Sequence, residues 1–402
     1  MYARNVFLLF AGILLVATGC DHRAPLAPFA EVGSTMGTTL SSKVSATNAW
    51  TGGARNLKGA IGPGALYAIE VPENWNGDLV VYVHGYDESA GPIRLPDIGY
   101  LKDPLMARGY AVTFSSFSAN GYALKEGAQQ THQLRGLFVS QVAIPRRTLV
   151  VGQSLGGIIA LKLAETYPGH YQGALLGCGV VGGTREEIEY IANVRVLFDY
   201  FYPGVLPGSL LEVSDGVNFG SLVPAIVTAI SSNPQGAFAM TRILPIPFAS
   251  SNELVEAIVR ALGFQFMGAA DFLDRAHGHV FFDNSDVVYT GAGLPQPLLD
   301  DLNARVARYD ATPDAENFLR HYYQPSGNLD IPVFTLHTTR DPVVPLFNET
   351  RYGEIAAGAG ASHLLFQRTV PAFGHCTYGA DKLLKAFDDL VAWVDTGVKP
   401  AS

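Results

Sequence analysis

The amino-acid sequence predicts an α/β fold, in which helices cover both faces of a mostly parallel sheet. Short apolar runs such as 79–83 (LVVYV) alternate with stretches of helical periodicity such as 155–167 (LGGIIALKLAETY). Continuous apolar strands are typical of parallel sheets, because both of their faces are buried. The 402 residues are enough for a large core, and 48% hydrophobic against 16% charged residues excludes a globally disordered chain.

Charge and cysteine content narrow the possible function classes. The chain carries 36 acidic and 27 basic residues, which gives a net charge of -9. This balance argues against a basic surface broad enough to bind nucleic acid, so we expect no nucleic-acid partner. With three cysteines and no Cys-x-x-Cys pair, neither a disulfide scaffold nor a zinc site is expected. We predict no metal and no cofactor.

The first residues resemble an export signal. Arg4 precedes an apolar stretch at 6–17, and small residues then lead to Cys20. This arrangement resembles a bacterial lipobox with a lipid on Cys20, so we predict a signal peptide at 1–19 and a tether at 20–48. The protein would be exported to the periplasm or outer surface and touch the membrane only through that lipid anchor. Ordinary signal cleavage, with a secreted product and an incidental Cys20, is the alternative.

The elements expected after the tether form two parts of one core, 49–180 and 331–402. Each part combines apolar, β-branched runs with stretches of helical periodicity. The expected strands are 66–71, 79–83, 110–114, 148–151, 174–177, 331–336 and 364–369. The expected helices are 97–108, 127–140, 155–167 and 382–394.

The interval 181–330 interrupts this alternation. It holds about 150 residues where a single helix would suffice, and a plain loop of that length is improbable in a compact domain. Apolar runs at 222–230 and 254–266 predict helices, and the strand pattern resumes afterwards. We therefore expect an inserted, mainly helical cap; an independent second domain is the alternative.

A candidate nucleophile lies where a strand meets a helix. The run 152–156 (GQSLG) follows strand 148–151 and opens helix 155–167, which is the context of a G-x-S-x-G nucleophile elbow. The tight turn needs small residues at both ends and lifts the Ser154 hydroxyl to the edge of the sheet. The backbone N–H of Leu155 would then face developing negative charge. An ordinary serine in a glycine-rich turn is the alternative.

A second loop of interest, His84-Gly85-Tyr86, follows strand 79–83. It resembles the His-Gly oxyanion loop of the α/β-hydrolases. Gly85 lets the backbone approach a substrate closely, and the N–H of Tyr86 would be the second oxyanion donor. We expect His84 to have a structural role.

Two further residues complete a candidate triad. A serine hydroxyl needs a neutral imidazole oriented by a carboxylate. Asp341 follows strand 331–336 and His375 follows strand 364–369, which matches the α/β-hydrolase order of Ser, acid, His. Asp330 and His363 precede their strands and so would lie at the wrong edge of the sheet. We expect His337, close to Asp341 in sequence, to be structural.

These motifs together resemble the α/β-hydrolase superfamily over residues 65–180 and 331–395. The resemblance implies an eight-stranded, mostly parallel sheet, with the cap inserted after the sixth strand, and a serine hydrolase that uses no metal. We expect carboxylic ester hydrolysis through an acyl-enzyme, on a small-molecule or polymeric ester. An amidase, peptidase or acyltransferase using the same triad is an alternative, as is a catalytically silent surface binding protein. The sequence predicts no particular oligomeric state.

The remaining cysteines lie beside the candidate site. Cys376 adjoins His375, and Cys178 ends the strand after the elbow helix. A Cys beside the base resembles tannases and fungal feruloyl esterases, where it bonds the Cys before the nucleophile; Gln153 holds that position here. A Cys178–Cys376 disulfide is one expectation for an exported protein, and two buried free thiols are the other.

Overall fold

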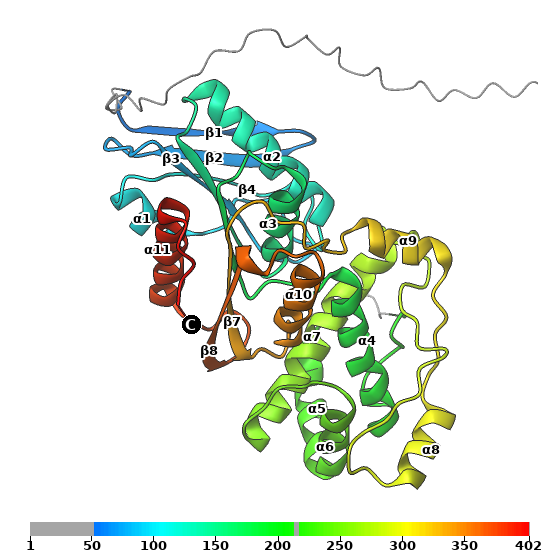
Figure 1. Cartoon of the computed structure of the whole chain (residues 1–402). Helices are drawn as coiled ribbons and strands as arrows, with labels where there is room; N and C mark the ends of the chain where they lie inside the picture. Colours follow the sequence, from blue (N-terminus) through cyan, green and yellow to red (C-terminus); the bar gives the residue numbers. More distant parts are fainter. Residues whose placement is uncertain (1–51, 213–216, 402) are drawn as a thin grey trace, which may run out of the picture. The chain divides into compact units, whose positions relative to one another are not determined.

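The computed structural model describes residues 52–212 and 217–401. The predicted signal peptide at 1–19, the tether at 20–48 and Cys20 lie outside the described residues. Eight strands form one sheet in the order β1-β2-β4-β3-β5-β6-β7-β8 (Figure 1). Their bounds are β1 Arg55–Ile61, β2 Ala65–Val71, β3 Asp78–Val83, β4 Ala111–Ser115, β5 Arg147–Gln153, β6 Gly173–Gly177, β7 Val333–Arg340 and β8 Leu365–Phe373.

The predicted parallel character of the sheet is confirmed. Strand β2 pairs antiparallel with both β1 and β4, and every pairing from β4 through β8 is parallel. Parallel neighbours need crossover connections, and helices supply them. The carboxyl ends of the parallel strands therefore meet at one edge, which is where the candidate site residues follow their strands.

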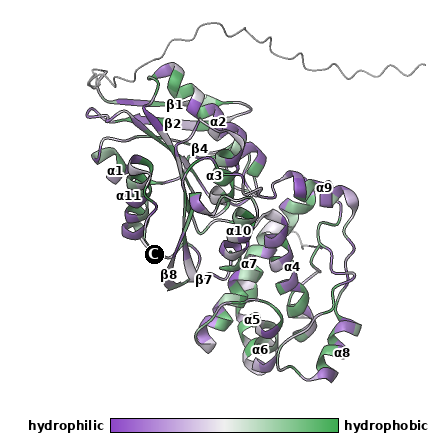
Figure 2. Cartoon of the chain, viewed as in Figure 1, coloured by the Kyte–Doolittle hydropathy of each residue, from purple (hydrophilic) through white to green (hydrophobic). Residues whose placement is uncertain are grey.

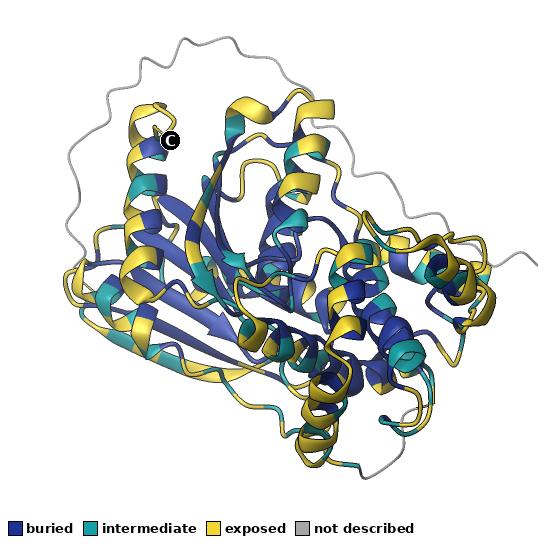
Figure 3. Cartoon of the chain, turned by 90° about the horizontal axis from the view of Figure 1, so that it is seen from below, coloured by how far each residue is buried: buried dark blue, intermediate teal, exposed yellow. Residues whose placement is uncertain are grey.

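Helices cover both faces of the sheet. The side chains of β3 alternate between them: Val80 and Tyr82 belong to the apolar cluster with α1 and α11, whereas Leu79 and Val81 pack on the opposite side with α2. Figure 3 shows the buried strands between helices whose outer faces are exposed. Figure 2 shows the matching mixture of hydrophobic and hydrophilic segments along the helices. The covering helices are α1 Gly99–Ala107, α2 Leu124–Gln141, α3 Leu155–Thr166, α10 Phe347–Gly358 and α11 Ala380–Thr396.

A helical cap is inserted between β6 and β7, as predicted. Among the described residues between these strands, the regular elements are helices. Its longest helix, α7, begins where the Ser250 hydroxyl accepts a hydrogen bond from the Glu253 amide. The cap and the sheet belong to one compact unit. The cap helices are α4 Thr184–Phe201, α5 Phe219–Ser232, α6 Pro234–Ile243, α7 Ser251–Arg275, α8 Gln296–Arg305 and α9 Pro313–His321.

Two elements of the core are absent from the sequence prediction. Strand β1 is an edge strand with mostly exposed or half-buried residues, so it lacks the continuous apolar run that marks the inner strands. Helix α10 buries polar residues such as Asn348 and Glu349, which weakens its apolar periodicity. Across the described residues, no helix combines the length and apolar character needed to cross a membrane.

Candidate active site

The turn between β5 and α3 has the geometry of a nucleophile elbow. Ser154 adopts φ 57° and ψ -126°, a backbone conformation that residues other than glycine rarely adopt. A Cβ atom at Gly152 would overlap the carbonyl oxygen of Gly156, and one at Gly156 would overlap the carbonyl oxygen of Val83. Both glycines are therefore required on steric grounds, and the turn aims the Ser154 hydroxyl out of the sheet.

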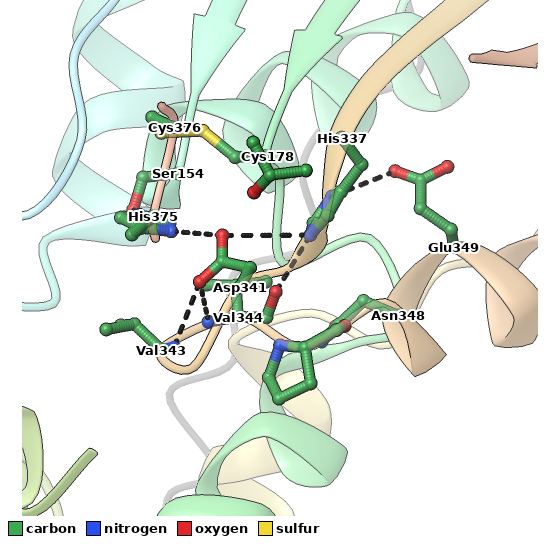
Figure 4. Close-up of polar contacts among 12 residues, drawn as sticks. Ser154, Cys178, His337, Asp341, Val343, Val344, Asn348, Glu349, His375 and Cys376 are labelled. Carbon is green, nitrogen blue, oxygen red and sulfur yellow. Dashed lines mark hydrogen bonds and ion pairs between the residues drawn. A yellow bond between two sulfur atoms is a disulfide. The ribbon is translucent and has the colours of Figure 1, made fainter. Parts of the chain in front are cut away.

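The structure brings Ser154, His375 and Asp341 together. The His375 Nε2 lies 2.8 Å from Ser154 Oγ, and its Nδ1 lies 2.7 Å from Asp341 Oδ2 (Figure 4). A carboxylate can only accept, so Nδ1 carries the proton and Nε2 is left as the acceptor for the serine hydroxyl. This arrangement can move a proton from Ser154 to His375.

The Asp341 carboxylate, which accepts the last hydrogen bond in the series from Ser154 through His375, is fully buried but ionised. The backbone amides of Val343 and Val344 donate to Asp341 Oδ1 over 2.9 and 3.0 Å. Burial opposes ionisation, but the charge and hydrogen bond of His375, the charge of His337 and the Val344 amide outweigh it. The pKa of Asp341 therefore lies below its ordinary value. Asp341 is therefore an anion, as it must be to accept the hydrogen bond that orients His375.

The start of α3 and the loop after β3 both lie beside Ser154. Leu155 occupies the first position of α3, where helix geometry leaves the N–H without an intrahelical acceptor. The loop after β3 approaches so closely that a Cβ atom at Gly85 would lie 3.1 Å from Ser154 Cβ. Glycine therefore lets the Tyr86 segment pass beside the nucleophile, as the oxyanion-loop prediction requires.

The other histidines and the other aspartate considered from the sequence do not contact Ser154. His84 stacks on Phe117 at 3.8 Å between ring centroids, and burial lowers its pKa, so it has a packing role. Asp330 and His363 are exposed at the amino ends of β7 and β8, away from the edge that carries Ser154. His337 is buried inside β7 beside Asp341.

The structure joins Cys178 and Cys376 in a disulfide, with their Cα atoms 5.3 Å apart. Cys178 follows β6 and Cys376 follows β8, so the bridge passes over the end of the intervening β7. Cys376 is the direct neighbour of His375. The bridge therefore restrains the loop that carries the candidate base.

We expect this bridge to contribute substantially to stability, because 198 positions separate its cysteines. In the chain-entropy account, closing such a loop contributes up to about 5 kcal/mol to the free energy of unfolding. A Cys20→Ser variant, denatured without reductant, should show no titratable thiol, and two after reduction. Its urea midpoint should fall on reduction. Two thiols without reductant would remove the bridge.

The cap helix α7 crosses the site and is anchored beside both ends. Near its start, Glu253 pairs with Arg340, the residue before Asp341, at 3.0 Å. Near its end, Asp271 accepts the Tyr122 amide at 2.7 Å. Between these anchors, Phe264 packs edge-on against Tyr86 with ring centroids 5.3 Å apart. The cap therefore forms part of the wall beside the oxyanion loop.

The hydrogen bonds of Gln153, next to the candidate nucleophile, were not predicted from the sequence. The Gln153 side chain accepts from Tyr82 and Tyr100, and donates to the Tyr378 hydroxyl at 2.6 Å. Tyr378 in turn lies 3.5 Å from the Cys178 sulfur. Where the tannase pattern has a cysteine before the nucleophile, this chain has an amide that links the elbow to the disulfide. No short motif records a contact between residues 225 positions apart.

Comparison with known proteins gives distant likenesses. No family model matches the chain. The o-phthalyl amidase of Xanthobacter agilis is 23% identical over 409 residues, covering 86% of this chain and 88% of that protein. An esterase from Aspergillus oryzae is similar in structure with TM-score 0.49 and 14% identity, covering 86% of this chain and 80% of its own. Lipase A of Candida antarctica is similar in structure with TM-score 0.45 and 15% identity, covering 84% of this chain and 75% of its own.

The chain's own topology decides the fold. One antiparallel strand lies among parallel ones, the elbow follows β5, an acid follows β7 and a histidine follows β8. With a helical cap after β6, this protein has the α/β-hydrolase fold.

Proposed function

We propose that this protein is a serine hydrolase that cleaves carboxylic esters through an acyl-enzyme. The observation that carries the proposal is the row of hydrogen bonds from Ser154 through His375 to the buried Asp341. A serine hydroxyl is a weak nucleophile on its own, and an oriented neutral imidazole is the group that activates it. The sharp elbow at Ser154 and the close approach of Gly85 support the same assignment.

In the first half of the proposed reaction, Ser154 Oγ attacks the ester carbonyl while its proton passes to His375 Nε2. The carbonyl oxygen becomes an oxyanion, and the amides of Leu155 and Tyr86 donate hydrogen bonds to it. The C–O bond to the alcohol then breaks, and His375 returns the proton to the leaving alkoxide. Asp341 stabilises the imidazolium that exists between these two proton transfers.

In the second half, water takes the place of the alcohol. His375 removes a proton from the water as its oxygen attacks the acyl-enzyme carbonyl. The tetrahedral intermediate collapses, the Ser154 ester bond breaks, and His375 returns the proton to Ser154. The products are a carboxylic acid and an alcohol, and the enzyme is restored.

The cap supports a preference for apolar acyl groups. An apolar pocket lies between α4 and α7, and its wall includes Phe264, the side chain that packs on Tyr86. The larger apolar side chains of the lining are Ile188, Ile191, Leu210, Phe264, Phe272 and Phe281.

An amidase is the second candidate function, because the relative at 23% identity is named an amidase. A p-nitrophenyl ester and a p-nitroanilide with the same aromatic acyl group separate the two. We expect rapid ester hydrolysis and anilide turnover at least about 100-fold slower. The reason is that the amine leaving group of an anilide depends more strongly on protonation by the general acid than the phenolate of the ester. Comparable rates would favour the amidase. Failure of a fluorophosphonate probe to label Ser154 would favour a silent binding protein.

A further inference from the structure

A second histidine lies directly behind the candidate acid. His337 sits in β7, four residues before Asp341, and its side chain is fully buried. Its Nε2 lies 3.8 Å from Asp341 Oδ2, and its Nδ1 lies 3.3 Å from Oε1 of Glu349 on α10 (Figure 4). Among the described residues, His375 and His337 are the only potentially cationic side chains within 4 Å of Asp341. The His337 imidazole thus lies between the buried carboxyl groups of Asp341 and Glu349.

The hydrogen bonds around His337 define where its protons are. Nε2 lies 2.8 Å from the carbonyl oxygen of Val344, and a carbonyl can only accept, so Nε2 carries a proton. Nδ1 and Glu349 Oε1 face each other at 3.3 Å, and both atoms lack any other polar partner. A neutral imidazole facing a carboxylate there would set two lone pairs against each other. One further proton must therefore lie between these two atoms.

The surroundings of Glu349 place that proton on the histidine. Its other oxygen, Oε2, accepts hydrogen bonds from Thr335 Oγ1 and Gln367 Nε2, which favour the carboxylate form. Burial acts to lower the pKa of His337, but Glu349, Asp341 and the Val344 carbonyl outweigh it and raise the pKa above its ordinary value. His337 is thus an imidazolium held between two anions.

We propose that His337 is a positioning residue for the hydrolase: a buried imidazolium that keeps Asp341 ionised and braces the turn whose amides bind it. The bracing contact is the Nε2–H bond to Val344, since Val344 donates its own amide to Asp341 Oδ1. The inference rests on the proposed function, because Asp341 matters as the partner of His375. Among the described residues, the other titratable groups nearby are Glu187 of α4, beyond Asn348, and the tyrosines Tyr190 and Tyr378. Burial raises the pKa of all three above its ordinary value.

The variant Glu349→Gln tests the proposal with little change of shape. A glutamine can still accept from Thr335 and Gln367 through its oxygen, while its N–H₂ faces His337 Nδ1 and supplies the proton that the histidine then lacks. His337 becomes neutral, so its positive charge no longer opposes protonation of His375. The acid limb of the kcat/KM profile should shift to higher pH by about half a unit or more. A purely structural defect would lower activity at every pH without moving this limb.

The matched control is Glu186→Gln. Glu186 lies on α4, is half-buried, and pairs with Arg351, which lies on the same helix α10 as Glu349. The pH profile of Glu186→Gln should coincide with that of the parent. His337→Gln should shift the acid limb in the same direction as Glu349→Gln, because both changes remove the positive charge of His337. The double variant should therefore add little. An unmoved limb in Glu349→Gln would end the positioning role.

Imidazole ¹⁵N spectra of the full chain read the charge without relying on catalysis. We expect both ring nitrogens of His337 to be protonated at neutral pH in the parent, and only Nε2 in Glu349→Gln. A neutral His337 in the parent would overturn the proposal even if esters are cleaved normally. If the spectra show a His337 imidazolium but the protein cleaves no ester, the charge assigned to His337 is correct and the proposed function is wrong.

Discussion

Replacing Ser154 by Ala is expected to abolish the burst of p-nitrophenol from a p-nitrophenyl ester and to lower kcat by about 10⁴-fold or more. The burst reports accumulation of the acyl-enzyme, which cannot form without the hydroxyl that lies 2.8 Å from His375 Nε2. Stopped-flow absorbance would measure the burst, and its amplitude in the parent should approach one per active site.

A suitable control for this variant is Ser140→Ala. The Ser140 hydroxyl is exposed on α2 and bonds only its own helix, to the carbonyl oxygen of Leu137. Burst amplitude should be unchanged there, and both variants should unfold at the same temperature as the parent, since neither residue packs in the core. An undiminished burst in Ser154→Ala would refute the assigned nucleophile.

Asp341→Asn should cost about as much, roughly 10⁴-fold in kcat, while leaving the fold intact. The asparagine oxygen can still accept the amides of Val343 and Val344, which places its N–H₂ toward His375 Nδ1. An amide donor there selects the tautomer with the proton on Nε2. That tautomer cannot accept the Ser154 proton, so the nucleophile is no longer activated.

Steady-state kinetics with the same ester measures this loss, and Asp330→Asn is the matched control. Asp330 is an exposed aspartate at the amino end of β7, whereas Asp341 follows its carboxyl end. The control should keep parental activity. Should Asp341→Asn retain activity within about tenfold of the parent, another group must orient His375.

Much of this site could be predicted because its parts are local. The glycines of the elbow, the strand before Ser154 and the helix after it all lie within one short stretch, so sterics and hydrophobic periodicity suffice to identify them. Asp341 and His375 follow apolar strands, and parallel strands present their carboxyl ends at a common edge. That rule separates them from Asp330 and His363 without any coordinates.

The charged groups behind the triad escaped prediction because they depend on packing between distant segments. His337 and Glu349 have no motif, and their shared proton follows only from the acceptors that β7, β8 and α10 bring to them. For Cys178 and Cys376 the sequence left a disulfide and two free thiols open, and the structure has the disulfide, because the strand order brings the two loops together.

By itself, the sequence determined the layered α/β core, the place of the cap and the three residues of the candidate triad, since each is encoded by periodicity or by a short turn. Only the tertiary structure decided the anchoring of α7 by Glu253 and Asp271, and the ionic row behind Asp341. The physical reason is that the energy of a buried charge depends on every neighbour within a few ångströms, and those neighbours come from segments far apart in the chain.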